Sequence, residues 1–144
     1  MTAGTGRVGL ARVTREPLDP AEHYAAVQDP AAGATASFSG VVRDHDHGRD
    51  VTELDYSEHP TAAAVVAEVA AEIAGRPGVI AVAVSHRVGV LRVGDIALAA
   101  SVSAAHRREA FAACIDLVDE VKHRLPVWKH QKFTDGSDEW VGTA

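Results

Sequence analysis

Hydrophobic and polar residues alternate along several short segments of this chain and recur at helical spacing along two longer ones. Apolar residues with a period of two are typical of strands, and such β-type segments occupy residues 7–14, 33–43, 51–58, 79–87 and 96–103. Apolar residues spaced three and four apart predict amphipathic helices over residues 60–74 and 104–124. Strands and helices are therefore expected to be interleaved along the chain.

Turn-forming and capping residues predict where these elements begin and end. Asp19 and Pro20 fit the cap and first position of a short helix that ends before Pro30. Ser103 is the expected cap of the second long helix. The polar segment 44–50 is expected to form a turn, with strand 51–58 returning after it, and Gly89 is expected to form a second turn. A last pair of strands is expected at residues 127–133 and 139–141.

Two long helices cannot cover both faces of a wide parallel sheet, so the pattern favours an α+β fold with a mostly antiparallel sheet. The chain of 144 residues is long enough for one domain with a substantial core. We predict a single domain spanning residues 1–144, with residues 1–6 flexible.

Composition excludes several classes of protein. The net charge of −6 argues against a general nucleic-acid-binding protein, which needs a basic face. A single cysteine, Cys114, excludes an internal disulfide and is consistent with a reducing compartment. We find no secretory signal and no apolar run long enough to span a bilayer. A cytoplasmic protein is therefore expected.

The second long helix carries a lysine within its apolar stripe. Lys122 falls among residues expected to face the core, namely Phe111, Cys114, Ile115, Val118, Val121 and Leu125. A lysine in that position either extends its amine to solvent or lines a pocket. The three lysines of the chain are Lys122, Lys129 and Lys132, all in its last quarter, whereas arginine supplies the other eleven cations. Because a desolvated lysine can lose its proton and an arginine cannot, this clustering favours a functional amine.

The start of the same helix carries the residues expected to bind an anion. His106 and Arg107 lie where backbone N–H groups and the helix dipole favour phosphate; a solvated first turn is the alternative. Arg107 and Lys122 are fifteen residues apart, or roughly 22 Å along a helix. One small substrate cannot easily reach both, so either they serve separate sites or a symmetric dimer forms composite sites.

The remaining polar positions give weaker signals. Arg43, at the end of a predicted strand, is a second candidate anion ligand. The His and Asp residues of segment 44–50 resemble metal ligands only in composition, so no metal site is predicted. We interpret His86 as structural or solvent-facing and Cys114 as an inert core residue.

Several segments together resemble the large, catalytic subunit of molybdopterin synthase, the MoaE family. They occur in the order of that family and cover nearly the whole chain. They are Phe-Ser-Gly-Val-Val-Arg (38–43), Leu-Asp-Tyr (54–56), Ser-His-Arg-Val-Gly (85–89), Ser-Ala-Ala-His-Arg (103–107), Lys122, Pro-Val-Trp-Lys (126–129) and Trp-Val (140–141).

This resemblance implies an α/β-hammerhead type fold and a homodimer within a heterotetramer. Each subunit would bind a small ubiquitin-like sulfur carrier whose C-terminal Gly-Gly tail ends in a thiocarboxylate. The enzyme would transfer sulfur to cyclic pyranopterin monophosphate, forming the molybdopterin dithiolene without a metal or redox cofactor. By position, Lys122 and Lys129 match the catalytic lysines, and Arg43, His106 and Arg107 match the substrate ligands.

The chain departs from the family pattern in ways that leave two alternatives open. Gln131 stands where many members have Glu, and the chain ends soon after Trp140 and Val141. A non-catalytic paralogue that still binds the carrier is one alternative. An unrelated small enzyme that binds a phosphate ligand is the other.

Overall fold

The computed structural model describes residues 6–142, which form nine strands and three helices. In chain order these are β1 (Arg7–Thr14), α1 (Pro20–Ala26), β2 (Ala34–Val41), β3 (His45–Asp46), β4 (Arg49–Glu58), α2 (Ala62–Ala74), β5 (Val79–Arg87), β6 (Gly89–Arg92), β7 (Ile96–Ala104), α3 (Arg107–Arg124), β8 (Val127–Phe133) and β9 (Asp138–Val141). Of the segment expected to be flexible, residues 1–5 lie outside this description.

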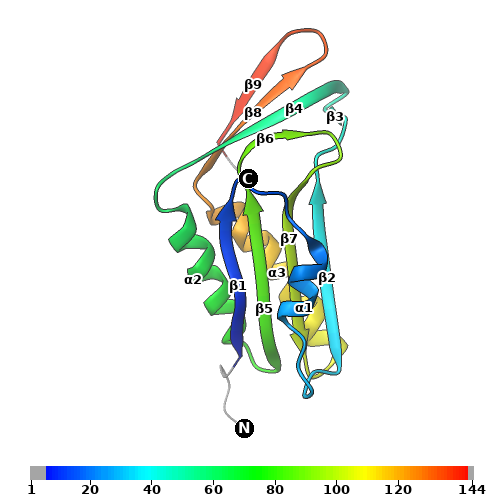
Figure 1. The fold of residues 1–144 in the computed structure, drawn as a ribbon, viewed down its shortest axis with the longest axis vertical. Helices are drawn as coiled ribbons and strands as arrows, with labels where there is room; N and C mark the ends of the chain where they lie inside the picture. The colour runs from blue at the N-terminus through cyan, green and yellow to red at the C-terminus, as the bar shows by residue number, and fades with distance from the viewer. Residues whose placement is uncertain (1–5, 143–144) are drawn as a thin grey trace.

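The larger part of the molecule is a four-stranded sheet with helices on both faces (Figure 1). Its strand order is β1-β5-β7-β2, in which β1 and β5 are parallel and the other two pairs are antiparallel. The helix α1 packs on one face, and α2 and α3 pack side by side on the other. This sheet ends at β2, which therefore has one unpaired edge within the described chain.

Alternate residues of β5 serve the two faces of this sheet, as the period of a strand requires. On the α1 side, Ala81 and Ala83 pack with Val27 in a small core. On the same side, His23 of α1 is fully buried. Its Nδ1–H donates to the carbonyl of Asp19, and Ser85 donates its hydroxyl to Nε2, each at 2.7 Å.

The opposite side of β5 faces the main core. Val82 and Val84 pack there in one cluster with Ile73 of α2 and Leu117 of α3. His86, the next residue of the same parity, lies beyond this apolar layer toward the second sheet. The parity of the strand thus aims His86 at the junction of the two sheets.

A second sheet crosses one end of the first and is built around the long strand β4 (Figure 1). β4 pairs antiparallel with β3, with β6 and with β8, and β9 extends the sheet beyond β8. The expectation that strand 51–58 returns along strand 33–43 is wrong, because β2 pairs with β7 instead. The turn expected at Gly89 is present, with φ of 88°, but the chain enters β6 at the same residue.

The helix α3 begins three residues later than predicted. Ser103 is not its cap but a fully buried residue of β7, because Ala104 is still paired with both Ala34 and Val79. His106 holds the cap position, without a hydrogen bond from its side chain. The helix therefore starts only where the sheet stops supplying backbone partners.

The predicted stripe of α3 is confirmed in part, since four of its six residues are buried, namely Cys114, Val118, Val121 and Leu125. Ala110, Ala113 and Leu117 are buried, whereas Phe111 and Ile115 are 63% and 60% exposed. Small alanine side chains let the helix approach the sheet closely, and this close approach decides which face is buried. The prediction gave too much weight to the large apolar residues.

The architecture is α+β, with mostly antiparallel sheets and two long helices, and agrees with the expected α/β-hammerhead type. Within residues 6–142, no helix is long and apolar enough to cross a membrane.

Candidate functional site

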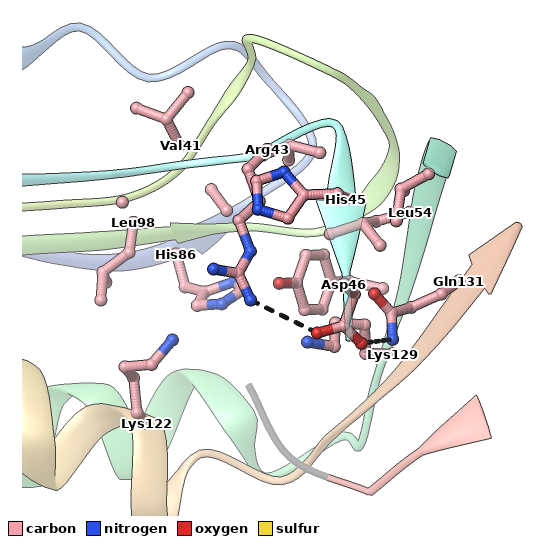
Figure 2. A pocket seen from close by; sticks show the side chains of 15 residues that line it. Val41, Arg43, His45, Asp46, Leu54, His86, Leu98, Lys122, Lys129 and Gln131 are labelled. Atoms are coloured by element: carbon pink, nitrogen blue, oxygen red, sulfur yellow. Dashed lines mark hydrogen bonds and ion pairs between the residues drawn. The ribbon is translucent and has the colours of Figure 1, made fainter. Parts of the chain in front are cut away.

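A pocket of about 260 Å³ opens where the two sheets and the end of α3 meet (Figure 2). Both sheets and α3 contribute to its wall. The lining residues are Gly40, Val41, Val42, Arg43, His45, Asp46, Val51, Leu54, Tyr56, His86, Ala97, Leu98, Lys122, Lys129 and Gln131. Three of the five candidate residues, Arg43, Lys122 and Lys129, therefore lie together.

Lys122 enters this pocket from the last turn of α3. Its neighbours Val121 and Leu125 anchor the end of the helix in the core, while its amine points toward His86 across the cavity (Figure 2). Partial burial lowers the pKa of Lys122, and the positive charge of Lys129 lowers it further. A lysine whose pKa is lowered in this way can give up a proton more readily than one in water.

The strand β8 brings Lys129 and Gln131 to the same wall. Its residues of odd number face inward, and Val127, Gln131 and Phe133 are buried. Lys132 has the other parity and lies on the outer face, with its Nζ 3.7 Å from Glu53. Of the three clustered lysines, only two therefore belong to the pocket.

Arg43 and Asp46 face Lys129 from the segment between β2 and β4. A guanidinium nitrogen of Arg43 donates to Asp46 Oδ1 at 3.3 Å, and the Arg43 side chain is 67% exposed. Gln131 donates from Nε2 to the other carboxylate oxygen of Asp46 at 2.9 Å. The departure of Gln131 from the family pattern thus does not leave the pocket without an acid.

His86 forms the floor of the pocket, so its interpretation as solvent-facing is wrong, and a structural residue there also lines the cavity. The ring is 2% exposed and packs edge-on against Tyr56, with ring centroids 4.9 Å apart. Its Nδ1–H donates to the carbonyl of Arg87 at 2.7 Å, which leaves Nε2 as an acceptor. Burial, together with the nearby charge of Lys122, lowers the pKa of His86 to about 4.

Tyr56 completes this buried floor, and burial raises its pKa to about 12. Both side chains are therefore neutral near pH 7, so the charges in the pocket come from its lysines, Arg43 and Asp46.

His86 and Asp46 are the residues that sequence reasoning missed. Continuing the alternation of β5 through Val82 and Val84 indicates an inward-facing His86, whereas no local pattern identified Asp46.

His106 and Arg107 lie at the opposite end of α3 and do not line the pocket. Both side chains are exposed. The separation expected from the sequence therefore holds within one chain, and the structure does not bring the two candidate groups together. Among residues 6–142, no cluster of three or more His, Cys, Asp or Glu residues could hold a metal ion.

A second, apolar groove of about 260 Å³ runs between β2 and α3. Phe38, Phe111 and Ile115 line it, and each is partly or largely exposed. Cys114 lies at its base, 6% exposed, and burial raises the pKa of its thiol. The groove therefore lies on the side of α3 between the anion-binding candidates and Lys122.

Comparison with known proteins identifies relatives along nearly the whole chain. A protein from Nostoc sp. named molybdopterin synthase catalytic subunit is 40% identical over 131 residues, covering 90% of this chain and 79% of that protein. Molybdopterin synthase catalytic subunit 1 of Mycobacterium tuberculosis is 40% identical over 142 residues, covering 95% and 93%.

A solved structure has the same fold. The crystal structure of molybdopterin synthase from Staphylococcus aureus superposes with a TM-score of 0.83 at 29% identity, covering 92% of this chain and 96% of that one. The family described as MoaE protein matches residues 13–124. The chain belongs to the MoaE family.

Proposed function

We propose that this chain is the catalytic subunit of a molybdopterin synthase. It takes sulfur from the thiocarboxylated end of a small ubiquitin-like carrier protein and delivers it to cyclic pyranopterin monophosphate, forming the dithiolene of molybdopterin. The observation that carries this proposal is the convergence of Lys122, Lys129 and Arg43 on one pocket in a member of the MoaE family. The names of its relatives, which are called catalytic subunits of this synthase, support the same reaction.

The two lysines have complementary roles in releasing the sulfur. Once sulfur links the acyl carbon of the carrier to the pterin, water adds to that carbon and the acyl C–S bond breaks. The products are a carboxylate and a thiolate, and two protons are released. Lys122, with its lowered pKa, takes up or returns a proton. The charge of Lys129 stabilises the oxyanion that forms at the acyl carbon.

The substrate phosphate is held by Arg43 together with His106 and Arg107 from a second copy of the chain. Because Arg107 and Lys122 lie at opposite ends of α3, one pocket can use both sets only across a dimer interface. The apolar groove beside α3 supports this arrangement. Its exposed Phe111 and Ile115 lie between the two sets of residues. A second copy that covers them removes this apolar surface from water and so stabilises the dimer.

The carrier is the second partner of this homodimer. Its Gly-Gly tail is narrow enough to enter the pocket and place the thiocarboxylate beside Lys122 and Lys129. One carrier on each subunit gives a heterotetramer. We place the reaction in the cytoplasm, and by its resemblance to the family it requires no metal or redox cofactor.

Single-turnover conversion of the cyclic pterin precursor by the wild-type protein, with thiocarboxylated carrier, tests the proposal. Dithiolene product is expected. Bound carrier without product would instead indicate a non-catalytic paralogue. Indifference to the carrier would favour an unrelated enzyme that binds a phosphate ligand.

A further inference from the structure

Two buried side chains on the floor of the pocket each have a polar atom without a partner. His86 and Tyr56 are 2% and 6% exposed, and both line the cavity. The Nδ1–H of His86 is engaged by the carbonyl of Arg87. Neither Nε2 of His86 nor the hydroxyl of Tyr56 makes a hydrogen bond within residues 6–142. Such atoms are uncommon, because burying a polar group without a partner is costly.

Both atoms open onto the cavity and not into closed core. The described chain also contains polar side-chain atoms that are sealed from solvent without a partner, and these belong to Arg12, Arg87, Ser103 and Glu109. His86 and Tyr56 are not in that group, so Nε2 and the hydroxyl each touch the open space of the pocket. Together they offer one acceptor in a fixed orientation and one hydroxyl that can both donate and accept.

These two atoms are suited to binding a water molecule. A buried water needs room for itself and two to four polar partners, and a cavity of about 260 Å³ leaves space for one on its floor beneath an entering ligand. Lys122 faces the same space, since its charge acts on the ring of His86 and its amine points toward that ring (Figure 2). The floor of the pocket thus provides an acceptor, a hydroxyl and an amine for one water.

We propose that His86 is a catalytic residue that holds the attacking water on the pocket floor, with Tyr56 as the second ligand of that water. This role rests on the proposed sulfur transfer. The water donates one O–H to Nε2 of His86 and directs the other toward the neutral amine of Lys122. As its oxygen bonds to the acyl carbon of the carrier, Lys122 takes the proton. The acyl C–S bond then breaks, sulfur leaves with the electron pair as a thiolate, and the second proton passes to solvent.

His86 orients the water without taking its proton. An imidazole whose pKa is about 4 is a weak base, so it accepts a hydrogen bond and stays neutral through the step. The alternative is a structural His86 that is buried only to satisfy the carbonyl of Arg87 through Nδ1–H.

Two amide substitutions separate these roles, because each preserves a different half of the imidazole. His86→Gln places an amide oxygen near the position of Nε2 but loses the bond to Arg87. The shorter His86→Asn keeps an N–H near the position of Nδ1 for the Arg87 carbonyl and has no acceptor at Nε2. A structural histidine predicts that Asn is the better replacement, whereas a water ligand predicts that Gln is.

Single turnover with thiocarboxylated carrier, followed by the intact mass of the carrier, measures the step directly. His86→Asn should form the carrier–pterin thioester at the wild-type rate but hydrolyse it about tenfold more slowly, as expected for one lost hydrogen bond, so that the adduct accumulates. His86→Gln should hydrolyse it at nearly the wild-type rate, and Tyr56→Phe several-fold more slowly. His23→Gln is the control, because His23 is also fully buried but lies on the α1 face, away from the pocket; it should accumulate no adduct.

Slower formation of the thioester in His86→Asn, its absence from that variant, or hydrolysis no faster in His86→Gln than in His86→Asn would each overturn the inference. A second measurement does not depend on activity. Nitrogen NMR of histidine-labelled protein at pH 7 should show His86 as the neutral Nδ1–H tautomer, identified by the loss of its signals in His86→Gln. The Nε2–H tautomer would also overturn the inference. If the wild-type protein forms neither thioester nor product, the proposed function fails, while the tautomer still tests whether Nε2 is a free acceptor.

Discussion

Burial of His86 should make this protein less stable as the pH decreases. The loss should begin near pH 6.5, above the range in which most carboxylates titrate. In the unfolded chain the histidine titrates near its ordinary pKa of 6.5, whereas in the folded protein the pKa of His86 is about 4. Between these values the unfolded state binds more protons than the folded state. The contribution of His86 to stability is therefore complete above pH 6.5, is lost as pH falls toward 4, and changes little below that.

The size of this effect follows from the two pKa values. Each pH unit between them corresponds to ~1.4 kcal/mol, so the full span from 6.5 to about 4 amounts to ~3 kcal/mol. Most of the window lies above pH 5. Between pH 7 and pH 5, His86 should lower the free energy of unfolding by about 2 kcal/mol.

Urea unfolding of the wild-type protein and of His86→Gln, each at pH 7 and pH 5, measures this contribution. Glutamine does not titrate, so the variant should lose about 2 kcal/mol less than the wild type between the two pH values. Any constant cost of the substitution cancels in that comparison. His123→Gln, at an exposed position on α3, should behave like the wild type. Equal pH dependence in His86→Gln and the wild type would refute the reasoning.

Four further predictions concern the site, the dimer and the fold. Lys122→Arg keeps the charge but not the titratable amine, so single-turnover sulfur transfer should fall about 100-fold; near-normal turnover would contradict a proton-transfer role. Arg107→Ala and Lys122→Ala chains, each inactive alone, should recover about a quarter of wild-type activity when assembled together, whereas sites within one chain would recover none. Ile115→Glu should sediment as a folded monomer, and a persistent dimer would place the interface elsewhere. Asp19→Ala removes the cap that accepts from Ala21 N at 2.9 Å, and should reduce the free energy of unfolding in urea by about 1 kcal/mol; an unchanged value would show that the cap contributes nothing.

Local patterns in the sequence predicted the strands and helices well. The short helix with Asp19 as its cap is confirmed, because capping depends on a few adjacent residues. The start of α3 was misplaced, because the pairing of Ala104 with Ala34 and Val79 depends on segments far away in the chain. Strand partners were missed for the same reason.

The candidate site was predicted in part. Lys122 was identified because a charged residue interrupts an apolar stripe, although that stripe proved to be turned toward Ala110 and Leu117. The pairing of Asp46 with Gln131 joins residues 85 positions apart and has no local signature. The periodic pattern of apolar and polar residues does not predict long-range contacts of this kind.

The 18 residues of α3 fix the distance between the anion ligands and the lysine that we propose for the site. Removing one residue from the middle of the helix would turn everything beyond it by about 100° and shorten it by about 1.5 Å. Lys122 would then leave the pocket wall, and a composite site could not compensate, because both subunits would change together. Changes in length during evolution should therefore accumulate in loops and at the chain ends, while the spacing from Arg107 to Lys122 stays fixed.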